Sequence, residues 1–243
     1  MRGNVRGILF DWGNTLVDYP LGNSADQIAF IAGFLTKRLP ANLLSRYRDE
    51  DEWNLMLQDL NSERSDHRMV PFQSRLHRLF PSIASRQAQD MEQELCQEIF
   101  ASAAPFPDSC RCVQLYLERG YRLGIVSNLP WGTSGDLWKM EMARHLGFLA
   151  PGLAIVTCAD AGWRKPRPDA LMQCAAGLSC DAASTLMIGD SSISDIAAAK
   201  AAGMQGVLLR CDANTSADGV PCFTDLDAFS AVLFGSETES KDG

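Results

Sequence analysis

The amino-acid sequence predicts an α/β fold, in which helices cover both faces of a parallel sheet and an all-helical insertion interrupts the chain near its start. Three observations lead to this prediction. An apolar run at residues 5–10 is typical of a buried strand. Residues 23–104 place apolar side chains at helical spacing and show no two-residue alternation. After residue 106, short apolar runs alternate with helical patterns, which favours parallel strands joined by helices.

Composition restricts the class of protein. The 243 residues can bury a sizeable core, and 46% hydrophobic and 21% charged residues are ordinary for a globular protein. A net charge of −8 argues against nucleic acid as a partner. The sequence has no apolar run of about 18 residues and no signal-peptide pattern, so we expect no membrane partner and a cytoplasmic location.

The cysteines give a further expectation about the compartment. All eight are scattered, and no Cys-x-x-Cys pair occurs. In a chain of this size without a secretion signal, this pattern predicts reduced thiols. Cys110 and Cys112 are a weak metal-binding candidate, because no second Cys or His pair accompanies them.

The first strand is followed by the segment around which the chain is organised. The apolar run ends in Asp11, and Gly13, Asn14 and Thr15 follow as turn residues. A carboxylate at the carboxyl end of a parallel strand lies where open α/β sheets bind ligands. Taken alone, Asp11 is equally consistent with a residue that caps a turn, so its interpretation depends on later segments.

The insertion is predicted to hold about four helices, because apolar residues recur three or four positions apart within it. Prolines at 40, 71 and 81 separate these helices. The charge-rich run at 46–52 is interpreted as a solvated helix face. The apolar positions that define the helices include Ile28, Ile31, Phe34, Leu35, Trp53, Leu57, Leu60, Met91, Leu95 and Ile99.

Beyond residue 106 strands and helices alternate regularly. Gly120 and Gly203 are expected to stop two of the helices, since glycine is common just past a helix end. The tail from Gly235 is short and polar and is expected to be disordered. Strands are predicted at 122–126, 153–157, 185–188 and 206–209, and helices at 109–119, at 135–146, after Pro168 and at 194–202.

Polar residues follow three of the predicted strands. Because the carboxyl ends of parallel strands meet at one edge of a sheet, these residues are expected to lie together. A lysine in the loop 162–168 can reach the same edge. The residues concerned are Asp11 after the first strand, Ser127 and Asn128 after the second, Gly189 and Asp190 after a later one, and Lys165 in the loop.

This set of side chains suits phosphoryl transfer. A carboxylate can attack an electrophile and form a covalent acyl-phosphate. A second pair, Asp190 and Asp195, can share Mg²⁺ with it, because hard oxygen ligands suit that ion. A hydroxyl and a backbone amide can bind phosphate oxygens, and a lysine can offset the charge that gathers on them.

Taken together, the segments at 11–15, 127–128, 165 and 188–204 resemble those of the haloacid dehalogenase superfamily, whose members are mostly phosphatases. The resemblance implies a Rossmann-like catalytic core formed by residues 1–19 and 106–234. It implies that the helical stretch 20–105 is an inserted cap domain, and it leaves 235–243 as a disordered tail. Mg²⁺ as the cofactor, a small phosphorylated metabolite as the partner and a monomeric or homodimeric state are the accompanying expectations.

The same resemblance assigns roles to individual residues. Asp11 is expected to be the nucleophile, and Lys165 the catalytic lysine. Ser127 is expected to bind phosphate through its hydroxyl. The remaining assignments are substrate or phosphate binding by Trp12, Thr15, Asn128 and Lys165, and metal binding by Asp11, Asp190, Asp195 and the backbone carbonyl of Gly13.

The first motif departs from the family pattern Asp-x-Asp-Gly-Thr, because Gly13 replaces its second aspartate. In family phosphatases that aspartate protonates the leaving group, and acid–base help of this kind contributes about 10²–10⁴-fold. Glycine keeps the backbone carbonyl, so metal and phosphate binding are expected to persist. Turnover then depends on whether another acid, such as Asp18 or one from the cap, takes over the task.

Three functions remain open at this point. The first is a Mg²⁺-dependent phosphatase that forms an aspartyl-phosphate on Asp11. The second is a phosphonatase-like C–P hydrolase with a Schiff base on Lys37, which is otherwise a solvated residue near a helix end. The third is a phospholigand-binding protein with little or no turnover. Dehalogenation is disfavoured because the Gly-Asp pair at 189–190 is present, and Trp131 either lines the pocket or packs on the core.

Overall fold

The computed structural model describes residues 5–19, 21, 23–47, 49–211 and 219–235. Most of the tail expected to be disordered, residues 236–243, lies outside this range. Within the range, a six-stranded sheet runs in the order β5-β4-β1-β6-β7-β8, and all its pairs are parallel. Its strands are β1 (Gly7–Phe10), β4 (Arg122–Ser127), β5 (Leu153–Thr157), β6 (Thr185–Gly189), β7 (Gln205–Leu209) and β8 (Cys222–Phe223).

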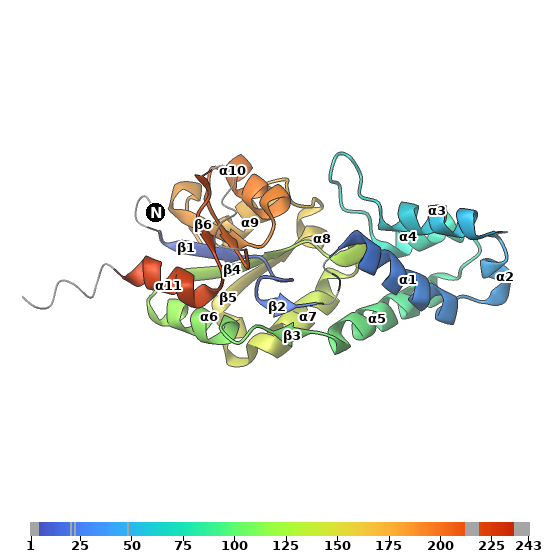
Figure 1. Ribbon diagram of the computed structural model, residues 1–243, viewed down its shortest axis with the longest axis horizontal. Coiled ribbons are helices and arrows are strands. Elements are labelled where there is room, and N and C mark those ends of the chain that lie inside the picture. The colour runs from blue at the N-terminus through green and yellow to red at the C-terminus, as the bar shows by residue number, and fades with distance from the viewer. Residues whose placement is uncertain (1–4, 20, 22, 48, 212–218, 236–243) are drawn as a thin grey trace, which may run out of the picture.

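Helices cover both faces of this sheet, which confirms the predicted α/β class (Figure 1). Side chains alternate across β1, so Ile8 and Phe10 join one apolar cluster and Leu9 joins the other. The first cluster includes side chains of α6 and α11, and the second includes side chains of α9 and α10. The helices after the insertion are α6 (Ser109–Glu118), α7 (Gly135–Leu146), α8 (Cys158–Ala161), α9 (Asp169–Gly177), α10 (Ala197–Ala202) and α11 (Leu226–Phe234).

The insertion forms a helical group at one end of the molecule, beyond the sheet (Figure 1). About four helices were expected, and five are found in the described residues because α2 adds a single short turn. A two-residue antiparallel pair, β2 (Val17–Asp18) with β3 (Ala104–Pro105), joins the two ends of the insertion and was not predicted. The five helices are α1 (Ser24–Arg38), α2 (Ala41–Leu44), α3 (Glu50–Asn61), α4 (Phe72–Leu79) and α5 (Ser85–Ala101).

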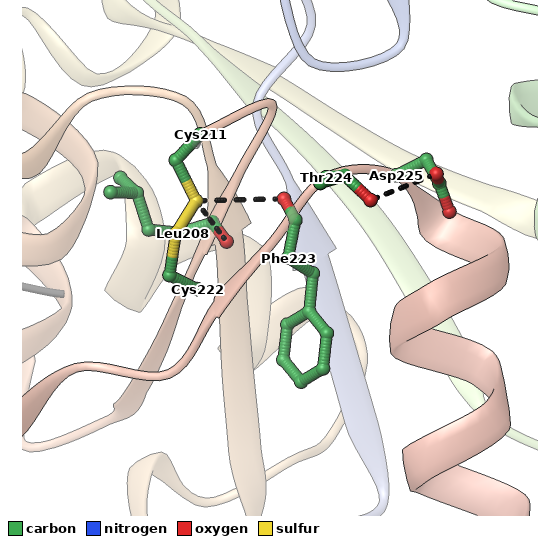
Figure 2. The surroundings of a disulfide bond; sticks show 6 residues. All are labelled: Leu208, Cys211, Cys222, Phe223, Thr224 and Asp225. Carbon is green, nitrogen blue, oxygen red and sulfur yellow. Dashed lines mark hydrogen bonds between the residues drawn. A yellow bond between two sulfur atoms is a disulfide. The ribbon is translucent and has the colours of Figure 1, made fainter. Parts of the chain in front are cut away.

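The C-terminal part corrects one expectation about cysteine. Cys211, which follows β7, and Cys222, in β8, form a disulfide bond, so the prediction of reduced thiols is wrong for this pair (Figure 2). The pairing of β7 with β8 brings together two residues 11 positions apart, which no local spacing pattern could indicate. The other six cysteines are free. The short strand β8 and the helix α11 were also not predicted.

Two further findings bear on the expected partners and on the site. No helix in the described part of the chain is long and apolar enough to cross a membrane. The helix expected at 194–202 begins earlier, as a five-residue π-helix at Ser192–Ile196 that continues into α10. Such single π-helical turns occur frequently at functional sites.

Candidate active site

The strand order brings the predicted residues to one edge of the sheet. β1 lies between β4 and β6, so Asp11 follows the central strand while Ser127 ends one neighbour and Asp190 follows the other. The Asp11 backbone N–H donates to the carbonyl of Ile188 at 2.8 Å, which continues the ladder to the end of β1. A cavity of about 170 Å³ opens there, and Asp11, Ser127, Asn128 and Lys165 line it.

Lys165 occupies the centre of the charged side of this cavity and is buried. Its ammonium donates to a carboxylate oxygen of Asp11 and to the Val126 carbonyl at 2.9 Å, and it pairs with Asp195 at 2.6 Å. Burial alone would lower the pKa of Lys165, but the two carboxylates outweigh it and raise that pKa. The lysine therefore remains a cation next to Asp11.

Asn128 fixes the main chain on both sides of this lysine. Its side-chain oxygen accepts from the Lys165 N–H at 2.9 Å, and its side-chain nitrogen donates to the Lys165 carbonyl at 3.0 Å. The side-chain amide of Asn128 is thus engaged with protein, although the residue was predicted to bind phosphate. The Ser127 hydroxyl lies beside it and contacts the Asn128 carbonyl at 3.3 Å.

Three carboxylates form a compact acidic group at the same edge. Asp11, Asp190 and Asp195 offer oxygen atoms that all lie within 4.8 Å of one another. The π-helical turn brings Asp195 back toward the strand end, where its Oδ2 accepts from the Ser191 N–H at 3.1 Å. An all-oxygen set of this kind fits Mg²⁺, which prefers hard ligands.

The clustering raises the pKa of two of these acids. Burial raises the pKa of Asp11 to about 7; Asp195 and Asp190 add to the rise, and Lys165 opposes it. Burial and the neighbouring Asp195 raise the pKa of Asp190 to about 6. A nearby cation is therefore needed to stabilise the negative charge of these carboxylates, and Lys165 provides part of this stabilisation.

Two of the predicted phosphate-binding residues lie behind the cavity wall. The Thr15 hydroxyl, fully buried, donates to Asp11 Oδ2 at 3.4 Å. The Trp12 indole N–H donates to the Tyr19 hydroxyl at 2.8 Å, and its ring is buried. These side chains support Asp11 and Tyr19 and do not line the cavity.

Gly13 and Asn14 line the cavity and keep the turn after β1. Asn14 has a φ of 57°, a left-handed conformation that asparagine adopts more readily than most residues. A Cβ at Gly13 would make ordinary van der Waals contact with the Tyr19 ring at 3.7 Å, so a side chain could begin there without a clash. Asp18 is exposed in β2 and does not line the cavity.

The remaining residues that line the cavity were not predicted from the sequence. Trp138 and Pro130 come from the core, and Tyr19 precedes the insertion, which itself contributes Leu21, Gln27 and Ile99. These are ordinary apolar or polar residues with no motif around them, so their shared position follows from the fold alone. Ser194, in the π-helical turn, also lines the cavity.

Two residues considered in the sequence analysis, Trp131 and Lys37, do not line the cavity. Trp131 stacks on Phe30 with ring centroids 6.1 Å apart and does not line the cavity, which favours the packing interpretation. Lys37 is exposed in the last turn of α1, ten residues beyond Gln27, or about 15 Å along the helix axis. The structure does not bring Lys37 to Asp11.

The fold and this edge of the sheet define an α/β protein with an acidic group and a buried lysine at its strand ends. A family model described as HAD-hydrolase-like matches residues 162–222, the part that contains Lys165, Asp190 and Asp195. In this part the chain is similar to HAD-like hydrolases.

Two curated relatives and one solved structure illustrate the similarity. A phosphoglycolate phosphatase from Rhodospirillum rubrum is 33% identical over 45% of this chain and 43% of its own length. A phosphoglycolate phosphatase from Neisseria gonorrhoeae is 27% identical over 84% of this chain and 79% of its own. The crystal structure of a HAD phosphatase from Thermococcus onnurineus aligns with a TM-score of 0.65 at 20% identity, over 95% of this chain and 99% of that one. The chain thus spans less than half of the first relative, and the solved structure supports the fold.

Proposed function

We propose that the protein is a Mg²⁺-dependent phosphatase that acts on a small phosphorylated metabolite through an aspartyl-phosphate on Asp11. The observation that carries the proposal is the Lys165 ammonium, held between Asp11 and Asp195 at the edge of a small cavity. The names of the two phosphatase relatives support the same class of reaction. Residues 20–105 are proposed to act as a cap that helps exclude water from the cavity.

The chain's own residues would carry the chemistry in two steps. A carboxylate oxygen of Asp11 attacks phosphorus, a new O–P bond forms, and the bond to the leaving oxygen breaks. Water then attacks phosphorus and releases phosphate and the free carboxylate. Ser127 would donate to a phosphoryl oxygen, and Lys165 would offset the charge that develops there. Mg²⁺, held by Asp11, Asp190, Asp195 and the Gly13 carbonyl, would supply further charge compensation for the phosphoryl oxygens.

The proposal also covers the location of the protein, its assembly and the alternatives to phosphatase activity. We place the protein in the cytoplasm. The six free cysteines support this location because reducing compartments keep thiols free, whereas the Cys211–Cys222 disulfide does not. A monomer or a homodimer remains the prediction for its assembly. The position of Lys37 gives no support to C–P cleavage through a Schiff base. Because Gly13 replaces the family's second aspartate, ligand binding with little or no turnover is the alternative outcome of the test.

The test compares the wild-type protein with Asp11→Asn in the presence of Mg²⁺. We expect wild type to release phosphate from p-nitrophenyl phosphate, and Asp11→Asn to lose at least about 1,000-fold, because removal of a nucleophile abolishes the covalent route. Asp18→Asn is the control, since Asp18 is an exposed acid away from the cavity. An inert wild type across a broad panel of phosphate esters would reject the proposal in favour of ligand binding.

A further inference from the structure

The cavity divides into a charged side and an uncharged side. Asp11 is the one carboxylate, and Lys165 the one cation, among the described residues that line it. The uncharged side is built by lining residues that carry no charge. Its side chains are Tyr19, Leu21, Gln27, Ile99, Pro130 and Trp138.

Two aromatic rings of this wall are held in place by their own contacts. The Trp138 indole N–H donates to the Thr133 hydroxyl at 2.9 Å, so this N–H is engaged within the protein. The rings of Tyr19 and Trp138 lie 5.5 Å apart, and Phe100 meets Trp138 edge-on at 4.9 Å. The wall therefore presents aromatic and aliphatic carbon in a fixed arrangement. The cavity as a whole, its charged side included, has a volume of about 170 Å³.

The chain offers no ready proton to a leaving group at this wall. The Lys165 ammonium makes contacts with three oxygens, those of Asp11, Asp195 and Val126, which match its three N–H donors. The Tyr19 hydroxyl accepts from Trp12, and burial raises the pKa of Tyr19 well above its usual range. The remaining polar side chains of the lining are hydroxyls and amides, which are poor acids.

We propose that the substrate is an aryl phosphate, a phosphate monoester whose leaving group is an uncharged phenol. This inference rests on the proposed phosphatase function and names its substrate class. The Asp11 carboxylate forms a bond to phosphorus, and the P–O(aryl) bond breaks with its electron pair on oxygen. The phenolate leaves without protonation by the protein and takes a proton from water afterwards. A leaving group with its own carboxylate, such as that of phosphoglycolate, would place a charge against the uncharged wall without a partner.

The first experiment measures how kcat/KM depends on the leaving group. Wild type, Gly13→Asp and Gly13→Asn are compared on substituted phenyl phosphates and on benzyl phosphate with Mg²⁺. We expect wild-type kcat/KM to fall steeply as the pKa of the leaving alcohol rises. Gly13→Asp, whose Cβ would make ordinary contact with the Tyr19 ring at 3.7 Å, should raise benzyl phosphate hydrolysis at least about 10-fold and flatten this dependence. Gly13→Asn, similar in size but not an acid, should leave the steep dependence unchanged.

The second experiment measures the effect of charge. We expect wild type to prefer phenyl phosphate over 3-carboxyphenyl phosphate by at least about 100-fold, since an unpaired charge in a closed site is strongly rejected. Gln27→Lys should recover at least about 10-fold of the lost activity on the carboxylated ester, and Gln27→Met should not. Equal or better turnover of phosphoglycolate by wild type would overturn the inference and leave the phosphatase function intact.

Binding keeps the inference testable if no ester is turned over. Phenylphosphonate and phosphonoacetate, which cannot be hydrolysed at a P–O(alkyl or aryl) bond, are titrated calorimetrically into wild type with Mg²⁺. Tighter binding of phenylphosphonate would support the aryl class while the phosphatase function fails. Equal or tighter binding of phosphonoacetate, which carries a carboxylate besides its phosphonate, would overturn the aryl class as well.

Discussion

At the scale of single residues, two glycines at this edge of the sheet have opposite surroundings. A Cβ at Gly13 would make only ordinary contact with the Tyr19 ring at 3.7 Å, whereas a Cβ at Gly189 would lie 2.3 Å from Asp195 Oδ2. Real Cβ atoms essentially never approach another atom so closely. Gly189 is therefore required for Asp195 to fold back against the end of β6, and it holds the acidic group together.

Gly189→Ala should consequently lose Mg²⁺ binding. The new methyl group has to displace Asp195, so one of the three carboxylates proposed to bind Mg²⁺ leaves the group, and we expect affinity to fall at least about 10-fold. Isothermal titration with MgCl₂ measures the change, with circular dichroism to show that the variant folds. Gly33→Ala is the matched control, since a Cβ there meets nothing within 4 Å. Unchanged Mg²⁺ affinity in Gly189→Ala would contradict the role given to Asp195.

The shared edge of three polar residues could be predicted from the sequence because each lies at the end of an apolar strand. Asp11, Ser127 and Asp190 stand out against the apolar runs that precede them, and a parallel sheet leaves one edge for them to share. The wall could not be predicted in this way. Leu21 and Ile99 are indistinguishable in sequence from residues of the insertion's own core, and the fold of the insertion alone brings them to Asp11.

At the scale of elements, long periodic segments were easier to predict than short ones. The strand at 153–157 and the helix at 135–146 lie where the sequence predicts them, because each buries a continuous apolar pattern. β2, β3 and β8 have two residues each, too few to show a two-residue period. The π-helical turn at Ser192–Ile196 also has no pattern of its own, although it sets the position of Asp195.

The loop that carries Lys165 depends on Asn128 for its position. Asn128→Ala removes two hydrogen bonds to the Lys165 main chain, so the ammonium should shift relative to Asp11. We expect kcat to fall about 10–100-fold, the usual effect of a misplaced catalytic group, with little change in KM. Steady-state kinetics with p-nitrophenyl phosphate measures both constants. Asn128→Asp keeps the acceptor but loses the donor, so its kcat should lie between those of the wild type and Asn128→Ala. A larger effect on KM than on kcat in Asn128→Ala would instead assign the side chain to phosphate binding.

At the scale of the whole molecule, the helical insertion is tied to the core beside the Lys165 loop. The segment between α3 and α4 pairs with that loop, as Met69 N–H donates to the Gly162 carbonyl at 3.0 Å and Arg164 N–H to the His67 carbonyl at 2.8 Å. Glu63 forms an ion pair with Arg164. The insertion therefore contributes to the cavity wall and also contacts the loop that holds the central cation.

Gly132 also lies close to the segment between α3 and α4, and its substitution tests the contact between the insertion and the core. A Cβ at Gly132 would lie 1.9 Å from the Val70 carbonyl oxygen, so Gly132→Ala must push the segment between α3 and α4 away from the core. Gly132 has a φ of 74°, and Gly203 has a similar φ of 71° with nothing within 4 Å of a Cβ. Gly203→Ala should lose about 1–2 kcal/mol of unfolding free energy from backbone strain alone.

Gly132→Ala should lose a further 1–3 kcal/mol or so, because it adds a steric clash to the same strain. Urea denaturation of both variants measures the difference. The displaced insertion should also widen the cavity, so we expect KM for aryl phosphates to rise in Gly132→Ala and to stay unchanged in Gly203→Ala. Equal losses of stability and equal KM values in the two variants would show that the contact near Val70 neither holds the insertion nor shapes the site.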